Sequence, residues 1–263
     1  MTDLIDPSAA TRAALPFALD RGIAARAALG LIVLATDQTI EHELRRLLDL
    51  PGVGLYQSRI LNDAQITPAT LAAMEGRLVA ATEVILPGLP LDVVAFGCTS
   101  ASMVIGEERV FELIRSVRPE VACTTPITAA FAAFRALEAR RIALLTPYRE
   151  DVNRLMRDYI EARGCAVPVI GSFNEADDRK AARIDAASIR RAALELGRSP
   201  EVDAVFVSCT SLRLVEAVGA IEAELGKPVT SSNHALAWHC LRLAGIDDRR
   251  GGCGSLFERG VGG

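Results

Sequence analysis

One nine-residue segment occurs twice in this chain, and its repetition limits the folds open to the sequence. Asp92–Ser100 reads Asp-Val-Val-Ala-Phe-Gly-Cys-Thr-Ser, and Asp203–Ser211 reads Asp-Ala-Val-Phe-Val-Ser-Cys-Thr-Ser. The acid, the cysteine, the threonine and the serine are in step in the two copies. Each copy is a short apolar run that ends in small polar residues, which is the pattern of a buried strand leading into a helix.

Two further pairs of segments repeat around these copies. Pro119–Ala130 is similar to Lys227–Trp238, and in both a strand pattern runs through a Thr/Ser turn into a helix pattern. Gly30–Asp37 is similar to Arg141–Tyr148 in the same way. The chain therefore reads as two copies of one α/β unit, which predicts two lobes with pseudo-twofold symmetry.

Apolar runs alternate with amphipathic stretches along the whole chain, as in parallel sheets flanked by helices. We therefore predict an α/β fold of two pseudo-symmetric, flavodoxin-like lobes, each a parallel sheet flanked by helices. The clearest strand patterns are Leu31–Leu34, Val93–Phe96, Ile142–Leu145 and Val205–Val207. The helix patterns are Glu41–Leu48, Thr67–Val84, Glu107–Val117, Val152–Arg163, Ala186–Leu196, Leu212–Leu225 and Ala235–Ala244, with a short one near Ala9–Ala14 in an N-terminal extension, residues 1–29.

Composition argues against several classes of partner. A net charge of −4, with basic residues scattered among acids, provides no basic stripe for nucleic acid. The start of the chain lacks a signal-peptide pattern, and no apolar run approaches the roughly 20 residues that span a bilayer, so we expect a cytoplasmic protein without a membrane segment. Six cysteines without a C-x-x-C pair and three scattered histidines predict neither a disulfide framework nor a metal site.

The paired cysteines carry the chemistry that the sequence suggests. Cys98 and Cys209 fall where strands end and helices begin, and a helix N-terminus can lower a thiol pKa enough to give thiolate at neutral pH. Thiols approaching one ligand from opposite faces would suit racemisation or cis–trans isomerisation, in which one group takes a proton or adds to a double bond while the other supplies a proton. The alternative is inert packing, since cysteine is often buried, but the matched turns favour a shared chemical role.

At these turns the sequence resembles the aspartate/glutamate racemase superfamily, in the branch that contains maleate cis–trans isomerase, arylmalonate decarboxylase and the ectoine-utilisation proteins. The Leu34–Glu41 segment looks most like the ectoine-utilisation proteins. The resemblance implies that no metal or organic cofactor is used, and that the last helix crosses back to the first lobe. It thus assigns residues 30–125 and 230–263 to the first lobe and 126–229 to the second. The matching segments are Phe96–Gly106, Leu145–Asn153, Val207–Arg213 and Gly226–Trp238.

The resemblance also implies roles for individual residues. Cys98 and Cys209 become the catalytic pair, and retention of both favours an isomerase or racemase, because arylmalonate decarboxylase keeps only the second cysteine. The residues assigned to a small carboxylate substrate are Asp37, Gln38, Thr99, Ser100, Tyr148, Asn174, Asp178, Thr210 and Ser211.

Two departures from maleate isomerase bear on the substrate. Asp37 stands where that enzyme has one asparagine, and Asp178 or Asn174 lies near the position of another. An acid facing a dicarboxylate would repel it, so we hypothesise a substrate with a cationic nitrogen beside its carboxylate. Asp37 could instead cap the helix that follows it.

Four functions remain open on the sequence alone. The first is a cofactor-independent isomerase or racemase of an amino-bearing carboxylic acid, with a place in ectoine degradation. The others are a maleate cis–trans isomerase, an arylmalonate-type decarboxylase and a non-catalytic two-lobed ligand-binding protein. The sequence leaves room for a homo-oligomer.

Overall fold

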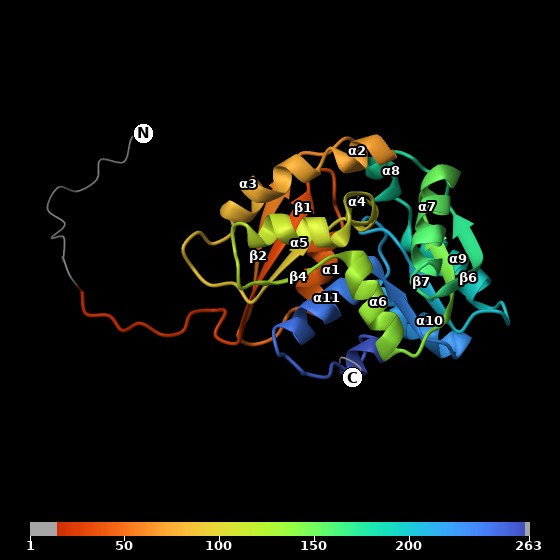
Figure 1. Ribbon diagram of the computed structural model, residues 1–263. Helices are drawn as coiled ribbons and strands as arrows, with labels where there is room; N and C mark the ends of the chain where they lie inside the picture. The colour runs from red at the N-terminus through yellow and green to blue at the C-terminus, as the bar shows by residue number, and fades with distance from the viewer. Residues whose placement is uncertain (1–14, 261–263) are drawn as a thin grey trace, which may run out of the picture.

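Two four-stranded parallel sheets, each covered by helices, form the computed structural model, which describes residues 15–260 (Figure 1). The sheets have the same strand order, β2-β1-β3-β4 and β6-β5-β7-β8. This confirms the predicted fold class and shows that the repeat in the sequence is a repeat in structure. The strands are β1 (Ala27–Leu34), β2 (Val53–Ile60), β3 (Val93–Phe96), β4 (Ala122–Thr124), β5 (Arg141–Thr146), β6 (Ala166–Ser172), β7 (Ala204–Val207) and β8 (Val229–Ser231).

The helices follow the sequence patterns, with two exceptions. The helix expected over Leu212–Leu225 is wrong in its first half, because residues 212–214 form a loop and the α-helix begins only at Val218. The N–H groups of Leu214 and Val215 bind the Glu43 carboxylate at this loop. The prediction of a single helix over Thr67–Val84 is wrong. The chain divides there into α2 (Pro68–Ala72), a 3₁₀ turn (Glu75–Arg77) around Gly76, and α3 (Leu78–Glu83). Glycine disfavours a helix interior, and the division falls at this residue. The helices are α1 (Ile40–Leu47), α2 (Pro68–Ala72), α3 (Leu78–Glu83), α4 (Thr99–Ile105), α5 (Glu107–Arg115), α6 (Pro126–Ala136), α7 (Glu150–Glu161), α8 (Asp178–Ala181), α9 (Ala186–Gly197), α10 (Val218–Leu225) and α11 (Ser232–Leu243), with 3₁₀ turns at Val215–Ala217 and Ser255–Glu258.

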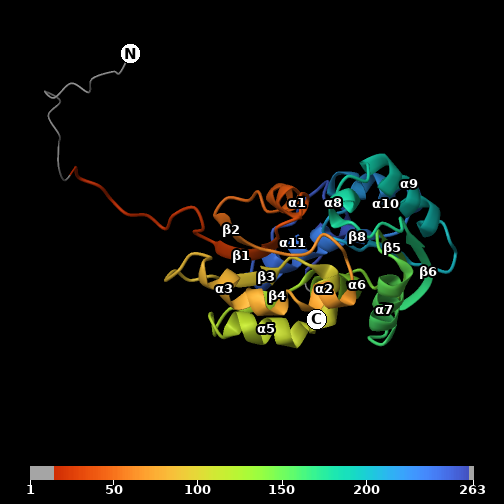
Figure 2. The same ribbon diagram turned by 90° about the horizontal axis from the view of Figure 1, so that it is seen from above.

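Helices α6 and α11 lie between the two sheets in both views (Figures 1 and 2). Helix α11 contacts α6 and α1, and it also touches β3, β4 and β8. The ring of Phe134 on α6 packs edge-on against Phe206 of β7, with centroids 5.3 Å apart. Trp238 on α11 is fully buried. The two sheets therefore share a continuous core, and the division at residues 125/126 and 229/230 stays a prediction.

The N-terminal region differs from the rest. Strand β1 begins at Ala27, and the exposed residues 15–23 extend away from the body (Figure 1), whereas Arg26 is held to it by an ion pair with Asp248. The helix predicted at Ala9–Ala14 lies outside the described residues. Within 15–260, no helix combines the length and apolarity that crossing a bilayer requires.

Candidate active site

The two cysteines stand at the carboxyl ends of equivalent strands. Cys98 follows β3 through Gly97 and occupies the residue before α4, and Cys209 follows β7 through Ser208. Glycine is required at 97, since a Cβ there would lie 2.7 Å from Cδ1 of Ile40 and 3.1 Å from the Ile32 carbonyl oxygen. This close approach lets the first turn pack directly against β1 and α1.

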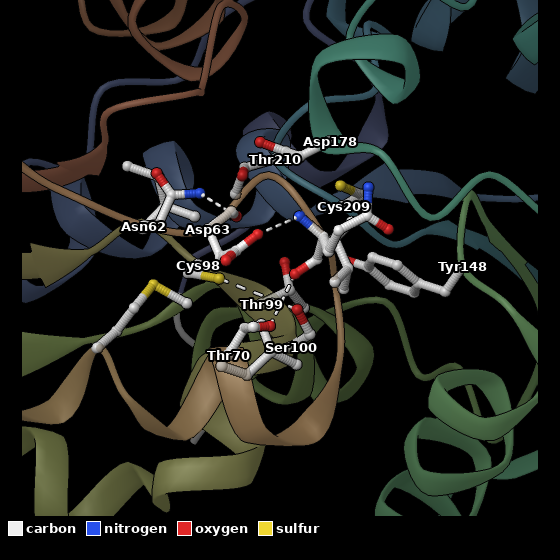
Figure 3. A pocket seen from close by; sticks show the side chains of 15 residues that line it. Asn62, Asp63, Thr70, Cys98, Thr99, Ser100, Tyr148, Asp178, Cys209 and Thr210 are labelled. Carbon is white, nitrogen blue, oxygen red and sulfur yellow. Dashed lines mark hydrogen bonds between the residues drawn. The ribbon is translucent and has the colours of Figure 1, made fainter.

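Both cysteines line one small cavity between the lobes (Figure 3). Its volume is ≈ 20 Å³, which is room for about one water molecule. The side chains of Cys98 and Cys209 are 5% and 4% exposed, so this arrangement is closed around the thiols. The lining residues are Leu34, Asn62, Asp63, Gln65, Ile66, Thr70, Leu71, Met74, Cys98, Thr99, Ser100, Tyr148, Asp178, Cys209 and Thr210.

Part of this lining, from Asn62 to Ile66, comes from the segment after β2, which no sequence pattern indicated as a site. The N–H of Ile66 donates to the Ala176 carbonyl, and the N–H of Asp178 donates to the Ala64 carbonyl, both at 3.0 Å. These bonds join a loop of the first lobe to a loop of the second across the cavity. No recognisable motif marks the segment, because its contribution depends on pairing with residues more than a hundred positions away.

Hydroxyl groups surround the thiols. Ser100 Oγ lies 3.9 Å from the Cys98 sulfur, and the backbone N–H of Ser211 points to the Cys209 sulfur at 3.4 Å. Tyr148 is buried beside Cys209 (Figure 3), and burial first, then the neighbouring cysteines, raise its pKa well above its usual value. The hydroxyls of Ser100, Tyr148 and Thr210 are thus neutral hydrogen-bonding groups available to a carboxylate.

Asp178 is the acid that the cavity brings beside the cysteines. It is 5% exposed, accepts a hydrogen bond from Ser211 Oγ at 2.9 Å and accepts another from Thr36 Oγ1. Of the cavity-lining residues in the described chain, none is Lys, Arg or His. Among residues 15–260, the groups that donate hydrogen bonds to the Asp178 carboxylate are therefore two hydroxyls, and no basic side chain is among them.

Four predicted site residues lie apart from the cavity lining. Ser211 is buried next to it, where its backbone N–H points to the Cys209 sulfur and its hydroxyl donates to Asp178. Asp37 is buried behind the cavity, where Oδ1 accepts the N–H groups of Thr39 and Ile40 at 2.7 and 2.8 Å, as a helix-capping acid does. Gln38 is turned outward because Asp37 points into the helix start, and it lies in a surface depression with Glu41 and His42. Asn174 is exposed with φ of 53° and lines a neighbouring crevice, so Asp178 rather than Asn174 occupies the cavity.

The expectation that a helix N-terminus lowers the thiol pKa is not met. Burial raises the pKa of Cys98 to about 12, and the nearby Asp178 adds to this rise. Burial, and then Asp178, also raise the pKa of Cys209. Desolvation of the charged form exceeds the effect of the few N–H groups near each sulfur. Both groups are consequently thiols at neutral pH in this closed arrangement.

The histidines do not build a metal site or assist the thiols. His234 uses both ring nitrogens elsewhere, on Thr230 Oγ1 at 3.0 Å and on the Cys253 carbonyl at 2.6 Å. Over residues 15–260, no group of three or more His, Cys, Asp or Glu side chains could hold a metal ion.

Comparison with known proteins gives consistent similarities over most of the chain. The family model for arylmalonate decarboxylase matches residues 29–257. A maleate isomerase from Nocardia farcinica is 30% identical over 244 residues, which are 88% of this chain and 95% of that protein. An arylmalonate decarboxylase from Bordetella bronchiseptica is 33% identical over 138 residues, covering 52% of this chain and 58% of the relative. A solved structure of Nocardia farcinica maleate cis–trans isomerase, a cysteine-to-serine mutant with a covalently bound succinylcysteine intermediate, has a TM-score of 0.80 at 27% identity, covering 88% of this chain and 98% of the other.

Proposed function

This chain belongs to the arylmalonate decarboxylase family, and from that membership we propose that it is an isomerase or racemase of a small carboxylic acid that also carries a cationic nitrogen. The proposal includes independence of metals and organic cofactors. It assigns the chemistry to Cys98 and Cys209, which line one cavity from the two lobes.

Two thiols in one cavity support isomerisation more than decarboxylation. In the proposed reaction, one sulfur, as thiolate, removes a proton from carbon or adds to a carbon–carbon double bond. The other thiol gives its proton to the opposite face of the same carbon skeleton. In racemisation the first sulfur ends as a thiol and the second as a thiolate, so the number of protons on the pair is unchanged and only their places are exchanged before the next turnover. In isomerisation the carbon–sulfur bond forms as the π bond breaks. After rotation about the resulting single bond, the second sulfur takes its proton back and the carbon–sulfur bond breaks, which restores the double bond and both sulfurs. A decarboxylase needs only a single proton donor after carbon dioxide leaves.

The single observation that carries the substrate class is the environment of Asp178. Its carboxylate faces the cavity with hydroxyl partners, Asp63 adds a second acid to the lining, and no basic side chain lines the described site. A dicarboxylate would meet only like charges there, whereas a cationic nitrogen would find a partner. Since Asp178 contributes to the raised pKa of both cysteines, a cation bound beside it would lower the pKa of both thiols and promote thiolate formation when substrate is present.

The Leu34–Glu41 segment supports a narrower proposal for the substrate, because it looks most like the ectoine-utilisation proteins. We place the substrate among the amino acids formed in ectoine degradation and the enzyme in the cytoplasm, where a reducing environment keeps thiols free. All six cysteines are free in the structure.

A binding titration tests the substrate class. N-acetyl-diaminobutyrate is expected to bind the wild-type protein more tightly than maleate, and Asp178→Asn is expected to reverse that order by removing the charge. Asp185→Asn is a matched control, because Asp185 caps α9 on the exposed surface and asparagine caps equally well. Tighter maleate binding by the wild-type protein would refute the cationic-substrate proposal.

Maleate isomerisation is the second candidate, favoured by the Nocardia relative that this chain matches over 95% of that relative's length. It predicts conversion of maleate to fumarate by the wild-type protein without any amino-bearing compound. Binding of N-acetyl-diaminobutyrate or maleate without conversion of either compound would instead indicate a non-catalytic two-lobed binding protein.

A further inference from the structure

Glu43 is a buried acid that the proposed chemistry does not use. It lies on α1 in the first lobe and is 3% exposed. Its Oε1 accepts the backbone N–H groups of Leu214 and Val215 at 2.7 and 2.8 Å, and its Oε2 accepts Nδ2 of Asn233 at 2.7 Å. Within residues 15–260 it forms no ion pair, so its carboxylate is held by these neutral donors.

These donors hold the loop that carries the second cysteine. Leu214 and Val215 lie a few residues after Cys209, on the segment between β7 and α10. The same Nδ2 of Asn233 also donates to the Thr210 carbonyl oxygen at 2.8 Å. Glu43 therefore reaches this loop both directly at its far end and, through Asn233, next to the cysteine.

The first cysteine needs no such support. Helix α4 begins at Thr99, directly after Cys98, and Ser102 Oγ within that helix donates to the Cys98 carbonyl at 2.6 Å. After Cys209 no helical turn begins before Val215, so the intervening loop is not fixed by helix geometry. The second turn is thus the one whose position depends on contacts from the other lobe.

From this asymmetry we infer that Glu43 is a positioning residue for Cys209, helping to set the place of its sulfur in the cavity through Asn233 and the Leu214–Val215 backbone. The inference rests on the proposed function only in giving Cys209 a chemical role. Glu43 itself does not line the cavity. Replacing Glu43 should therefore change the position of Cys209 and leave Cys98 in place.

Ionisation of Glu43 matters to this role. A protonated Oε2 would direct its O–H against the Asn233 N–H, whereas the carboxylate accepts all three donors. Burial raises the pKa of Glu43 to about 7. The charged and titratable groups around it are Asp37 ahead of α1, His42 and Arg46 on α1, and Arg213 and Glu216 from the facing loop. Arg46 and Glu216 pair with each other at 3.0 Å.

The test measures modification of both cysteines in one sample with methyl methanethiosulfonate, a small thiol reagent, resolved by peptide mass spectrometry. In Glu43→Gln at pH 8.5, we expect Cys209 to react about fivefold faster relative to Cys98 than in wild type, because its loop opens more readily. Glu216→Gln makes the same chemical change on an exposed residue of the facing segment and should leave the ratio unchanged.

The wild-type pH profile provides a second measurement that needs no variant. Both thiols titrate well above pH 9, so their thiolate fractions change in parallel between pH 5.5 and 8.5. On lowering the pH, the Cys209:Cys98 ratio should therefore rise with a midpoint near 7, where Glu43 takes up its proton, rather than near 6, where Asp37 does. An unchanged ratio in a folded Glu43→Gln variant, or a flat wild-type profile if that variant does not fold, overturns the inference. Failure of the proposed function would appear separately, as absence of turnover in a wild-type protein whose labelling ratio still shifts.

Discussion

The hydroxyl oxygens of Thr99 and Ser232 lie 2.8 Å apart, which joins the turn after the first cysteine to the first residue of α11. Ser232 Oγ also accepts the backbone N–H of Cys209 at 3.1 Å. One fully buried hydroxyl thus contacts both cysteine turns. The relative position of the two turns is set by this shared contact and by the loop contacts of Glu43.

Replacing the shared hydroxyl should be costly. Ser232→Ala leaves the buried N–H of Cys209 without its acceptor, and an unsatisfied buried donor costs about 1–3 kcal/mol. Urea denaturation should show a loss of unfolding free energy in that range. Ser116→Ala, which removes an exposed hydroxyl at the end of α5, should change stability by no more than about 0.5 kcal/mol. Equal stabilities of the two variants would contradict the structural role of Ser232.

Single cysteine variants separate isomerase from decarboxylase. A two-thiol reaction predicts that Cys98→Ala and Cys209→Ala each reduce turnover by about 10²–10⁴-fold, the range for a positioned acid or base. A decarboxylase would keep its activity in Cys98→Ala and lose it only in Cys209→Ala. Cys165→Ala is the control, because Cys165 is buried outside the cavity. Steady-state rates on racemisable, cis–trans and malonate-type acids decide between the two reactions.

The free protein should protect its thiols from alkylation. With its pKa raised from 9.0 to about 12, Cys98 carries about 10³-fold less thiolate at pH 8 than an ordinary cysteine. Iodoacetamide should therefore label it at least that much more slowly than free cysteine. Cys253 is only half-buried and provides the internal reference that should react first. Rapid labelling of Cys98 at neutral pH would show that the closed cavity does not represent the free protein.

The fold was predictable because its signals are local. Apolar runs of strand length, polar turns and amphipathic helices each occupy a short window, and the repeat of these windows encodes the matching strand orders. The ends of the strand patterns also predicted the turns that carry Cys98 and Cys209, and the structure brings both cysteines to one cavity. Their catalytic role stays a prediction.

The supporting contacts were not predictable in the same way. Glu43 and Asn233 meet across 190 residues. Glu43 lies in no pattern that marks a site, and Asn233 lies in the matching segment Gly226–Trp238 without a role that the pattern assigns. Asp37 and Gln38 are neighbours in sequence, yet the first points inward to the start of α1 and the second outward to solvent. The raised thiol pKa values follow from complete burial, which one sequence does not reveal.

The pH dependence of stability provides the last prediction, through Asp37. Burial raises its pKa from 3.8 to about 6, so the native state keeps a proton that the unfolded chain releases. Its contribution to stability is fully present below pH 3.8 and is lost as the pH rises through 6. A shift of this size corresponds to about 3 kcal/mol. Buried His234 and His239, whose pKa values fall to about 4, act in the opposite direction and flatten the wild-type profile.

A variant comparison isolates the Asp37 effect from the histidines. Asn at 37 can still accept the Thr39 and Ile40 N–H groups, so Asp37→Asn should gain unfolding free energy relative to wild type as the pH rises from about 4 to 6. Asp185→Asn should show nearly the same stability difference from wild type across this range, because bonds to Ser188 lower the pKa of Asp185 and its pH-dependent contribution changes only below 3.8. Urea denaturation at pH 4, 5 and 7 measures both differences. Parallel pH profiles for wild type and Asp37→Asn would mean that Asp37 is not desolvated in the native protein.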